Sequence, residues 1–395
     1  MKKGFFVKIT AAALTIFVTL CFTANASQNV SDDTKTTSKP GNDLSLTCKS
    51  AVLMEASTGE VLYAHNESEA LPPASVTKVM TLLLVMEAID SGALRYTDTV
   101  TASANAASMG GSQIYLKEGE TMSVEDLLKS VVIASANDAA VALAEHIAGS
   151  EEAFVVKMNE RAAELGMTST KFENTNGLDD TTTEHLTSAK DIAIMSRELI
   201  KHRKILEYSS TWMDTIRDGS FGLTNTNRLV RFYNGATGLK TGSTSKAKFC
   251  ISATANRDGM ELICVIMGAE TRDVRNAEAK ALLDWGYSSF ELYKCEAQTQ
   301  SSVKVIGGVE SYVGTESGEK VFVVKKGEAK KIQKTINLPE KISAPIEKGT
   351  AVGDVLLRVD GKEVGKVDII SSSSVDKISF SVLFGRIIKG FFLSA

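Results

Sequence analysis

The sequence is poor in the residues that bind metals or build disulfide frameworks. Among 395 residues it has four histidines and five cysteines, and it has no His-Glu-x-x-His pair. The cysteines are scattered, which argues against a zinc site and against a disulfide scaffold. We therefore expect no metal ion and no other cofactor. Cys250 and Cys264 could face each other across a hairpin, although buried apolar thiols are the simpler interpretation.

An excess of one charge sign is also missing. The formal net charge is -4, from 44 basic and 48 acidic residues. This balance creates no field that would attract nucleic acid, so we expect no nucleic-acid partner. The length exceeds that of one typical domain, and the hydrophobic fraction of 43% is ordinary for a globular protein. Partners must therefore be inferred from particular sites.

Outside its two ends the chain has no long apolar segment. Residues 9–22 form an apolar run that is short for a membrane-spanning helix. This run follows Lys2, Lys3 and Lys8, and Ala24-Asn25-Ala26 then matches a small-x-small cleavage pattern. We predict a secretory signal over residues 1–26 and therefore export, with an uncleaved anchor as the alternative. Residues 27–45 are polar and predict a flexible tether.

Strand patterns stand at both ends of residues 46–288, and helical patterns occupy the middle. Residues 50–63 and 247–268 each predict a β-hairpin, the second around Asn256-Arg257-Asp258-Gly259. The two hairpins can share one antiparallel sheet only if the helical part is an insertion between them, which gives an α+β fold. Helical periodicity is present from residue 75 and over residues 124–148, 151–165, 188–202 and 271–287.

The pattern changes after residue 288. Short β-rich runs alternate with glycine turns over residues 289–371 and predict a small all-β, β-sandwich-like domain. Residues 372–395 place large apolar side chains on one side of a helix, which suits the plane of a membrane surface. Docking of this amphipathic helix on the protein's own core is the alternative. The apolar positions are Phe380, Leu383, Phe384, Ile387, Ile388 and Phe391.

The first candidate for chemistry is Ser75-Val76-Thr77-Lys78, at the start of a predicted helix. A spacing of three places the Ser75 hydroxyl and the Lys78 amine on one helix face. A serine hydroxyl needs a base before it becomes a nucleophile, and a lysine amine can be that base when burial or a nearby cation lowers its pKa. The alternative is an N-cap serine beside a solvated lysine.

Two further motifs carry polar residues in unusual places. Ser135-Ala136-Asn137 interrupts an apolar helical run, where polar side chains need partners or a cleft. Lys240-Thr241-Gly242 follows a glycine-rich turn and precedes a strand. Its cation could pair with a carboxylate, and its glycine would let the backbone approach a substrate closely. Taken singly, the first motif could be a helix cap and the second an ordinary turn.

Together the three motifs carry a resemblance that none of them carries alone. They occur in order at a helix start, a helix junction and a strand edge. Over residues 51–287 the chain resembles serine-type D-alanyl-D-alanine carboxypeptidases, the low-molecular-mass penicillin-binding proteins. Gly111-Ser112-Gln113 and Asn174-Thr175-Asn176-Gly177-Leu178 are also similar to that family. One departure is Lys248, where we expect a glycine; it should alter the strand edge rather than the chemistry.

The resemblance implies the fold of penicillin-binding proteins and serine β-lactamases, and a catalytic role for five residues. Ser75 would attack the penultimate D-alanine of a peptidoglycan stem peptide ending in D-Ala-D-Ala. Lys78 would accept its proton, and Ser135 would relay a proton to the leaving amine within a network that Asn137 helps to hold. The backbone N–H groups of Ser75 and Ser243 would bind the oxyanion.

The same resemblance implies the substrate contacts and the location. Lys240, Thr241 and Gly242 would bind the substrate, with Lys240 on its terminal carboxylate. Two ammonium groups in one cleft repel, so the more desolvated one, Lys78, should lose its proton. β-Lactams would be covalent inhibitors trapped at Ser75. The protein would act outside the cytoplasm, on the outer face of the cytoplasmic membrane, held there through its C-terminal helix.

Three other functions remain open from the residues alone. A D,D-endopeptidase would use the same chemistry on a crosslink, since the difference lies in cleft shape. A class A-like β-lactamase needs a glutamate that activates water, and the surroundings of Glu173 lack the Glu-x-x-x-Asn spacing. A non-catalytic peptidoglycan-binding protein could keep the fold, although every chemical residue is present.

Overall fold

The computed structural model describes residues 44–180 and 182–392. The predicted signal, most of the predicted tether and the last residues of the tail lie outside this part of the chain. Within it, a region of helices around a five-stranded sheet is followed by a region made mainly of strands and by a terminal helix.

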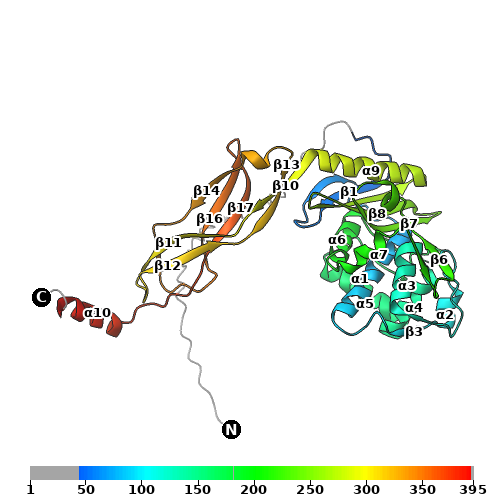
Figure 1. The fold of residues 1–395 in the computed structure, drawn as a ribbon, viewed down its shortest axis with the longest axis horizontal. Coiled ribbons are helices and arrows are strands. Elements are labelled where there is room, and N and C mark those ends of the chain that lie inside the picture. Colours follow the sequence, from blue (N-terminus) through cyan, green and yellow to red (C-terminus); the bar gives the residue numbers. More distant parts are fainter. Residues whose placement is uncertain (1–43, 181, 393–395) are drawn as a thin grey trace, which may run out of the picture. The chain divides into compact units, whose positions relative to one another are not determined.

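Five antiparallel strands form the sheet that the two hairpins predict (Figure 1). Their order is β2 (Val61–His65), β1 (Ser50–Glu55), β9 (Met260–Ala269), β8 (Lys248–Arg257) and β7 (Ala236–Thr244). β1 pairs with β9 over its whole length, with Val52 opposite Val265. The hairpins at the two ends of this region therefore share one sheet, and the α+β fold with a helical insertion is confirmed.

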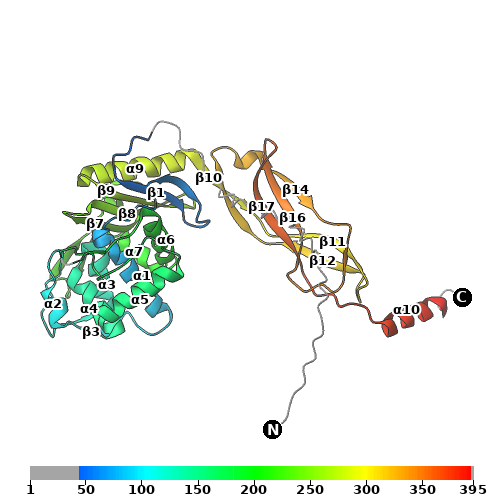
Figure 2. The same cartoon turned by 180° about the vertical axis from the view of Figure 1, so that it is seen from behind.

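Different helices cover the two faces of this sheet. Strand alternation sends Val52 and Met54 into one core and Ala51 and Leu53 into the other. α9 (Arg272–Ser289) packs on the second face, and the inserted helices pack on the first (Figure 1, Figure 2). The inserted helices of eight or more residues are α1 (Lys78–Asp90), α4 (Asn137–Ala148), α5 (Glu151–Glu164) and α6 (Ala189–Leu199).

Short elements join these helices and shape the side of the sheet that holds the predicted motifs. At the start of α6, Ser188 Oγ caps the helix by accepting a 3.1 Å hydrogen bond from the backbone N–H of Asp191. The short elements are β3 (Thr99–Thr101), α2 (Ala104–Ser108), β4 (Thr121–Ser123), α3 (Val124–Lys129), α7 (Lys204–Ser209), β5 (Met213–Ile216), β6 (Phe221–Thr224) and α8 (Leu229–Phe232).

The cysteines do not pair across the hairpin. Cys264 lies opposite Ala253 in the β8–β9 ladder, whereas Cys250 belongs to the core on the other face of the sheet. All four cysteines of the described residues are buried free thiols. Burial raises the pKa of Cys250 to about 11, so this thiol stays protonated. The interpretation of these cysteines as small apolar side chains is confirmed.

The region after α9 consists mainly of strands, as its sequence pattern predicts. β10 (Phe290–Cys295) pairs with β13 (Lys320–Lys325). Val355, Leu357, Val367 and Ile369 alternate inward from two neighbouring strands and form a small core of their own. In sheet order the other strands are β14 (Gln333–Asn337), β16 (Ala351–Val359), β17 (Lys362–Ser371), β12 (Tyr312–Ser317), β11 (Gln298–Ile306) and β15 (Lys341–Ser343).

The last element is α10 (Phe380–Phe392), within the predicted amphipathic tail. Its described large apolar side chains are exposed, and Phe380 and Phe384 stack with ring centroids 6.0 Å apart. Among the described residues, no helix combines the length and the apolar character that a membrane crossing requires.

Lys248, the departure from the expected glycine, begins β8 in a left-handed conformation. Its φ is +58°, a region that glycine adopts freely and other residues avoid. The Cβ clash at such a φ costs about 1 kcal/mol. Its ammonium lies 3.6 Å from the Glu270 carboxylate, and both side chains are exposed, so this ion pair offsets little of the strain.

We therefore expect Lys248→Gly to raise the free energy of unfolding by up to about 1 kcal/mol, because glycine removes the strain at this φ. Chemical denaturation of the two proteins measures the difference. Lys248→Ala is the matched control, since it loses the ion pair but keeps the left-handed Cβ. Equal stabilities of the glycine and alanine variants would contradict this account.

Candidate active site

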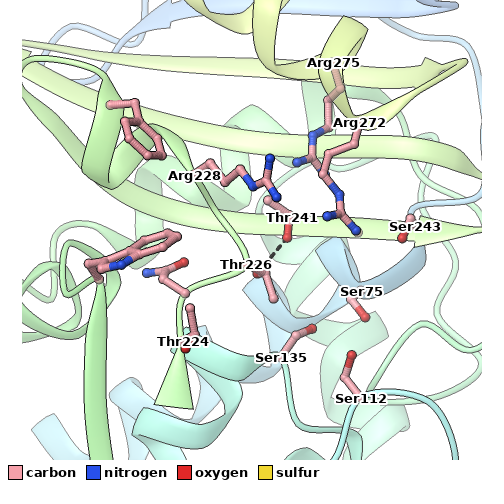
Figure 3. A pocket seen from close by; sticks show the side chains of 14 residues that line it. Ser75, Ser112, Ser135, Thr224, Thr226, Arg228, Thr241, Ser243, Arg272 and Arg275 are labelled. Carbon is pink, nitrogen blue, oxygen red and sulfur yellow. Dashed lines mark hydrogen bonds between the residues drawn. The ribbon is translucent and has the colours of Figure 1, made fainter. Parts of the chain in front are cut away.

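Residues from all three motifs line one cleft of about 570 Å³. The side chains of Ser75, Ser112 and Ser135 gather beside β7, which supplies Thr241 and Ser243 (Figure 3). The volume lies in the range of sites that enclose small ligands. The other lining residues are Gly242, Trp212, Thr224, Asn225, Thr226, Arg228, Phe232, Arg272 and Arg275.

A strained turn presents Ser75 to this cleft. Ser75 is half-buried in the 3-10 turn Ala74–Thr77, directly before α1. Ala74 has a φ of +48°, an unfavourable value for alanine that the surrounding structure must hold. Gly177 packs tightly against it, since a Cβ at position 177 would lie 1.9 Å from the Ala74 carbonyl oxygen. The close approach of this glycine therefore fixes the shape of the turn.

Lys78 lies beneath Ser75 with its side chain fully buried. Its Nζ is 3.0 Å from Ser75 Oγ, 2.5 Å from Asn137 Oδ1 and 2.7 Å from the carbonyl oxygen of Asn176. The Asn137 amide is oriented by its Nδ2, which donates to the Gly110 carbonyl at 2.7 Å. Two of the three neighbours of Nζ are therefore oxygens that only accept hydrogen bonds.

The surroundings of Lys78 favour its neutral form. Burial is the larger cause of its lowered pKa and the charge of Lys240 is the second, while Asp138 acts in the opposite direction. A neutral amine has two hydrogens and one lone pair. When the two carbonyl-type oxygens take the hydrogens, the lone pair faces the Ser75 hydroxyl. This geometry can remove the hydroxyl proton.

A break between two helices positions Ser135 and Asn137. The helical pattern over residues 124–148 is divided into α3, a π-helical turn (Ser130–Ala134) and α4. Ser135 follows the π turn with a φ of +64°, a left-handed conformation typical of functional sites when the residue is not glycine. Its Oγ accepts a 2.9 Å hydrogen bond from Lys240 Nζ. The motif therefore contacts Lys78 through Asn137 and contacts Lys240 of β7 through Ser135.

Lys240 is buried in the wall of the cleft. Its side chain is 1% exposed, and Nζ donates to Ser135 Oγ and to the Thr241 carbonyl, both at 2.9 Å. Burial, with the charge of Arg275 nearby, lowers its pKa to about 7. The sequence predicts an ammonium group on the cleft surface, whereas the structure places it behind the hydroxyl of Ser135.

Gly242 brings the β7 backbone against the turn that carries Ser75. A Cβ at position 242 would lie 2.8 Å from both the backbone nitrogen of Ser75 and the carbonyl oxygen of Pro73. Such distances to backbone atoms are not tolerated, so only glycine allows the strand to lie this close. Ser243, the next residue, lines the cleft beside Ser75.

Three arginines outside the motifs line the same cleft (Figure 3). Arg228 precedes α8, while Arg272 and Arg275 lie in the first turn of α9. Among the described residues, none of the three has a carboxylate within 4.0 Å. Guanidinium groups without a counter-charge suit a carboxylate ligand. In the sequence, the one sign that these arginines act together is the spacing of three between Arg272 and Arg275, which places both on one face of a helix.

A buried histidine behind the turn that carries Ser75 is a second feature that the motifs do not indicate. His185 Nδ1 accepts a 2.9 Å hydrogen bond from the backbone N–H of Glu173, so the neutral ring has its proton on Nε2. Nε2 lies 2.7 Å from Thr77 Oγ1, which donates to the Ala74 carbonyl at 2.9 Å. Burial lowers the pKa of His185 to about 4. These bonds tie the loop that contacts Lys78 to the turn before α1.

A serine whose hydroxyl faces a buried lysine, on an α+β sheet with a helical insertion, defines an active-site-serine enzyme of the penicillin-binding type. Residues 33–271 match the family described as D-alanyl-D-alanine carboxypeptidase, and residues 287–377 match the penicillin-binding protein 5 C-terminal domain. The carboxypeptidase DacF of Bacillus subtilis is 44% identical over 356 residues, covering 88% of this chain and 91% of that protein.

Other relatives agree with this match. D-alanyl-D-alanine carboxypeptidase DacC of Escherichia coli is 35% identical over 87% of each chain. Penicillin-binding protein 5 of Haemophilus influenzae has a TM-score of 0.78 and 32% identity, covering 84% of this chain and 98% of that one. Penicillin-binding protein D2 of Listeria monocytogenes, in its ampicillin-bound form, has a TM-score of 0.57 and 32% identity, covering 62% and 99%. The chain belongs to the D-alanyl-D-alanine carboxypeptidase family.

The depressed pKa of His185 predicts a loss of stability in mild acid. Its value of about 4 lies below the ordinary 6.5, so its stabilising effect is complete above pH 6.5 and is lost as the pH falls toward 4. In that window the free energy of unfolding should fall by up to about 1.4 kcal/mol per pH unit from this group. Denaturant unfolding of the natural protein and of His185→Gln measures this, and the variant should show a flatter dependence.

A direct titration provides the control. The chain has four histidines, so the imidazole resonance that disappears in His185→Gln can be assigned by NMR. That resonance should titrate well below pH 6. Titration near pH 6.5 would contradict the burial argument, even if the variant proved too unstable for unfolding measurements.

Proposed function

We propose that this chain hydrolyses the C-terminal D-alanyl-D-alanine bond of peptidoglycan stem peptides, with Ser75 as nucleophile and Lys78 as base. The observation that carries the proposal is the geometry around Lys78 Nζ. Two acceptor oxygens at 2.5 and 2.7 Å direct its lone pair toward Ser75 Oγ at 3.0 Å. Ser75 Oγ attacks the carbonyl carbon of the penultimate D-alanine as Lys78 removes its proton.

The oxyanion of the tetrahedral intermediate lies between the backbone N–H groups of Ser75 and Ser243. The close packing permitted by Gly242 supports this assignment, because it brings β7 beside the nucleophile turn. Ser135 passes a proton to the leaving amine, and the bond from Lys240 to its Oγ orients this hydroxyl. The amide bond breaks, D-alanine leaves as the amine, and water then hydrolyses the ester on Ser75.

The terminal carboxylate of the substrate binds at the cationic end of the cleft. Thr241 and the guanidinium groups of Arg228, Arg272 and Arg275 line that end. Lys240 is buried and donates to Ser135 Oγ, so it adds positive charge near the cleft without touching the substrate carboxylate itself. The charge-assisted contact holds the terminal carboxylate, one residue beyond the scissile bond, and so orients that bond at Ser75. This chemistry uses no metal and no cofactor.

β-Lactams acylate Ser75 in this proposal, and the ester persists because the leaving amine stays tethered. The relative from Listeria, solved in its ampicillin-bound form, supports the binding of a β-lactam in this fold. The β-lactamase alternative has less support, because the Glu173 carboxylate accepts a hydrogen bond from the Thr183 backbone and does not line the cleft. The endopeptidase alternative also has less support, because the matching family and the curated relatives are described as carboxypeptidases.

The enzyme acts outside the cytoplasm, attached to the outer surface of the cytoplasmic membrane. The predicted signal over residues 1–26 and the location of peptidoglycan support export. The exposed apolar side chains of α10 support membrane association, because Phe380 is 82% and Phe384 is 54% exposed in the chain itself. A lipid surface would cover them, while Arg386 and Lys389 would face the headgroups.

Ser75→Ala should abolish both reactions, because it removes the only atom that forms the acyl bond. We expect no free D-alanine from diacetyl-Lys-D-Ala-D-Ala and no mass increase after incubation with benzylpenicillin. Intact-protein mass spectrometry and a D-alanine assay provide the two readouts. Ser91→Ala, an exposed serine at the end of α1, is the control and should react normally. A penicillin adduct on the Ser75→Ala protein would refute the assignment.

The membrane proposal predicts a face-dependent effect on vesicle binding. Phe384→Asp should weaken binding of the full-length mature chain to phosphatidylglycerol-containing vesicles by about ten-fold or more, since a large apolar side chain no longer enters the bilayer. Gly385→Asp adds the same charge at the neighbouring position, on the polar side of the helix, and should have a smaller effect. Co-sedimentation measures both. Equal losses, or none, would count against the helix as the anchor.

A further inference from the structure

The segment before α10 is hydrogen-bonded to the turn that joins β11 and β12. Val309 in this turn donates its backbone N–H to the Asp376 carbonyl at 2.8 Å. Ile378 donates its N–H to the Gly307 carbonyl, also at 2.8 Å. Phe380, the first residue of α10, follows two positions after Ile378. The amphipathic helix therefore begins directly beside the β11–β12 turn.

Close packing holds this junction together. Gly308 lies opposite Lys377 in an antiparallel bridge. A Cβ at position 308 would lie 2.8 Å from Val375 Cγ1, so glycine lets the turn pack this closely on the segment before the helix. One side chain of the helix also contacts the turn, because the Arg386 guanidinium donates to the Val309 carbonyl. The turn and the start of α10 therefore form one end of the β region.

Two large apolar side chains flank this turn and point outward. Strand alternation sends Val305 and Val313 into a small core, while Ile306 and Tyr312 lie on the outer face. Ile306 is 47% and Tyr312 is 61% exposed, and the ladder makes them diagonal neighbours. A single exposed apolar residue is ordinary on a protein surface. Here an aliphatic and an aromatic side chain lie together where an apolar helix begins, and tyrosine is enriched at membrane–water interfaces.

Two lysines extend this outer face away from the turn. Lys304 lies opposite Tyr312 on β12 and opposite Lys341 on β15, so the three side chains share one face of the sheet. Among the described residues, neither lysine has a carboxylate within 4.0 Å. On this face of β12 the next carboxylate belongs to Glu316, about 13 Å along the strand from Tyr312. The outer face is therefore apolar beside the turn and cationic behind it.

We propose that this surface, the β11–β12 tip (Ile306, Tyr312, Lys304 and Lys341), is a second membrane contact that enters the headgroup layer of an anionic bilayer beside α10. This inference rests on the membrane attachment in the proposed function, which assigns that role to α10 alone. Ile306 and the Tyr312 ring leave water for the boundary of the acyl chains, and the lysines contact lipid phosphates. Because the tip and the start of α10 belong to one hydrogen-bonded unit, binding of either one brings the other to the bilayer at a high effective concentration.

The position beside α10 favours a lipid surface as the occupant. A bilayer that covers the exposed side chain of Phe380 is already at the level of the turn, because the chain between them is hydrogen-bonded to that turn. Lysines without carboxylate partners suit lipid phosphates. A helix in the plane of the membrane leaves the tilt of the β region open, and a second contact fixes it. A protein partner is the competing occupant.

Co-sedimentation with phosphatidylglycerol-containing vesicles tests the tip in the full-length mature chain. Ile306→Asp and Tyr312→Asp should each weaken binding by about five- to ten-fold, because a large apolar side chain no longer enters the bilayer. Ile336→Asp is the matched control and should bind like the natural protein. Ile336 is 53% exposed and lies on β14, the edge strand on the far side of the six-stranded sheet from β11.

Charge gives an effect of the opposite sign. Glu310 is exposed in the turn itself, where its carboxylate opposes the approach to anionic lipid. Glu310→Gln should therefore strengthen binding to phosphatidylglycerol vesicles by about two- to five-fold, and Lys304→Gln should weaken it by a similar factor. Neither change should alter binding to phosphatidylcholine vesicles. The same response to both lipids would contradict the contact between the lysines and lipid phosphates.

A fluorescent label measures the contact directly. The four cysteines of the described residues are buried, so Tyr312→Cys provides an exposed thiol for an environment-sensitive dye. The dye emission should shift to the blue with vesicles and should be quenched by brominated lipid. The same dye on Ile336→Cys should show neither effect. A blue shift without quenching would place the tip against protein and would overturn the inference.

Phe384→Asp, measured in parallel, separates this inference from the proposed anchor. If it weakens binding while Ile306→Asp and Tyr312→Asp bind normally, α10 is the anchor and the tip is not a contact. If only the tip variants weaken binding, the tip stands and the helix proposal fails. An equal loss in Ile336→Asp would overturn the inference. Penicillin labelling should be unchanged in every variant, since none of these residues lines the cleft, and the dye decides for any variant that fails to fold.

Discussion

Burial of a lysine amine away from water disfavours its charged form. Lys78 is buried in this way directly beside the hydroxyl of Ser75. The side chain is fully buried, and two oxygen acceptors fix the directions of its hydrogens. Further contacts hold the two acceptors in place. The Asn137 side chain is oriented by its hydrogen bond to the Gly110 carbonyl, and His185 connects the loop that contains Asn176 to the turn that carries Ser75.

The site is held in shape by backbone conformations that are unfavourable in isolation. Ala74 and Ser135 both have positive φ values, and each is next to or part of the catalytic constellation. Such residues stay in place only when packing over-determines them. Gly177 and Gly242 provide that packing, because their missing Cβ atoms let other backbone segments come within contact of the nucleophile turn. Small residues at these points are therefore needed for the shape of the turn that carries Ser75.

Positive charge does two things in this cleft. The guanidinium groups of Arg228 and Arg272 suit a carboxylate, whereas the buried Arg275 guanidinium donates to Asn276 Oδ1 and to the Cys250 carbonyl. Burial is the main cause of the lowered pKa of both lysines, and the charge of Arg275 adds to it at Lys240 as the charge of Lys240 does at Lys78. In the proposed mechanism, one cluster of cations both orients the substrate and favours the neutral base.

The motifs indicate the proposed reactive residues because this chemistry depends on local spacing. A hydroxyl and an amine three residues apart at a helix start share a face, and the strand patterns at both ends of the region can share one sheet only if the helical part is an insertion between them. The arginines could not be found in this way. Arg228 and Arg272 are separated in sequence by three strands, and only the packing of α9 on the sheet brings them to one wall.

The sequence by itself determined the α+β fold, the order of the catalytic motifs and the family, since periodicity and local spacing are properties of short segments. Only the tertiary structure decided that Lys240 is buried, that Cys250 and Cys264 lie on opposite faces, and that Trp212 lines the cleft. Burial and long-range contact are set by how distant segments pack, and no short stretch of residues encodes that packing.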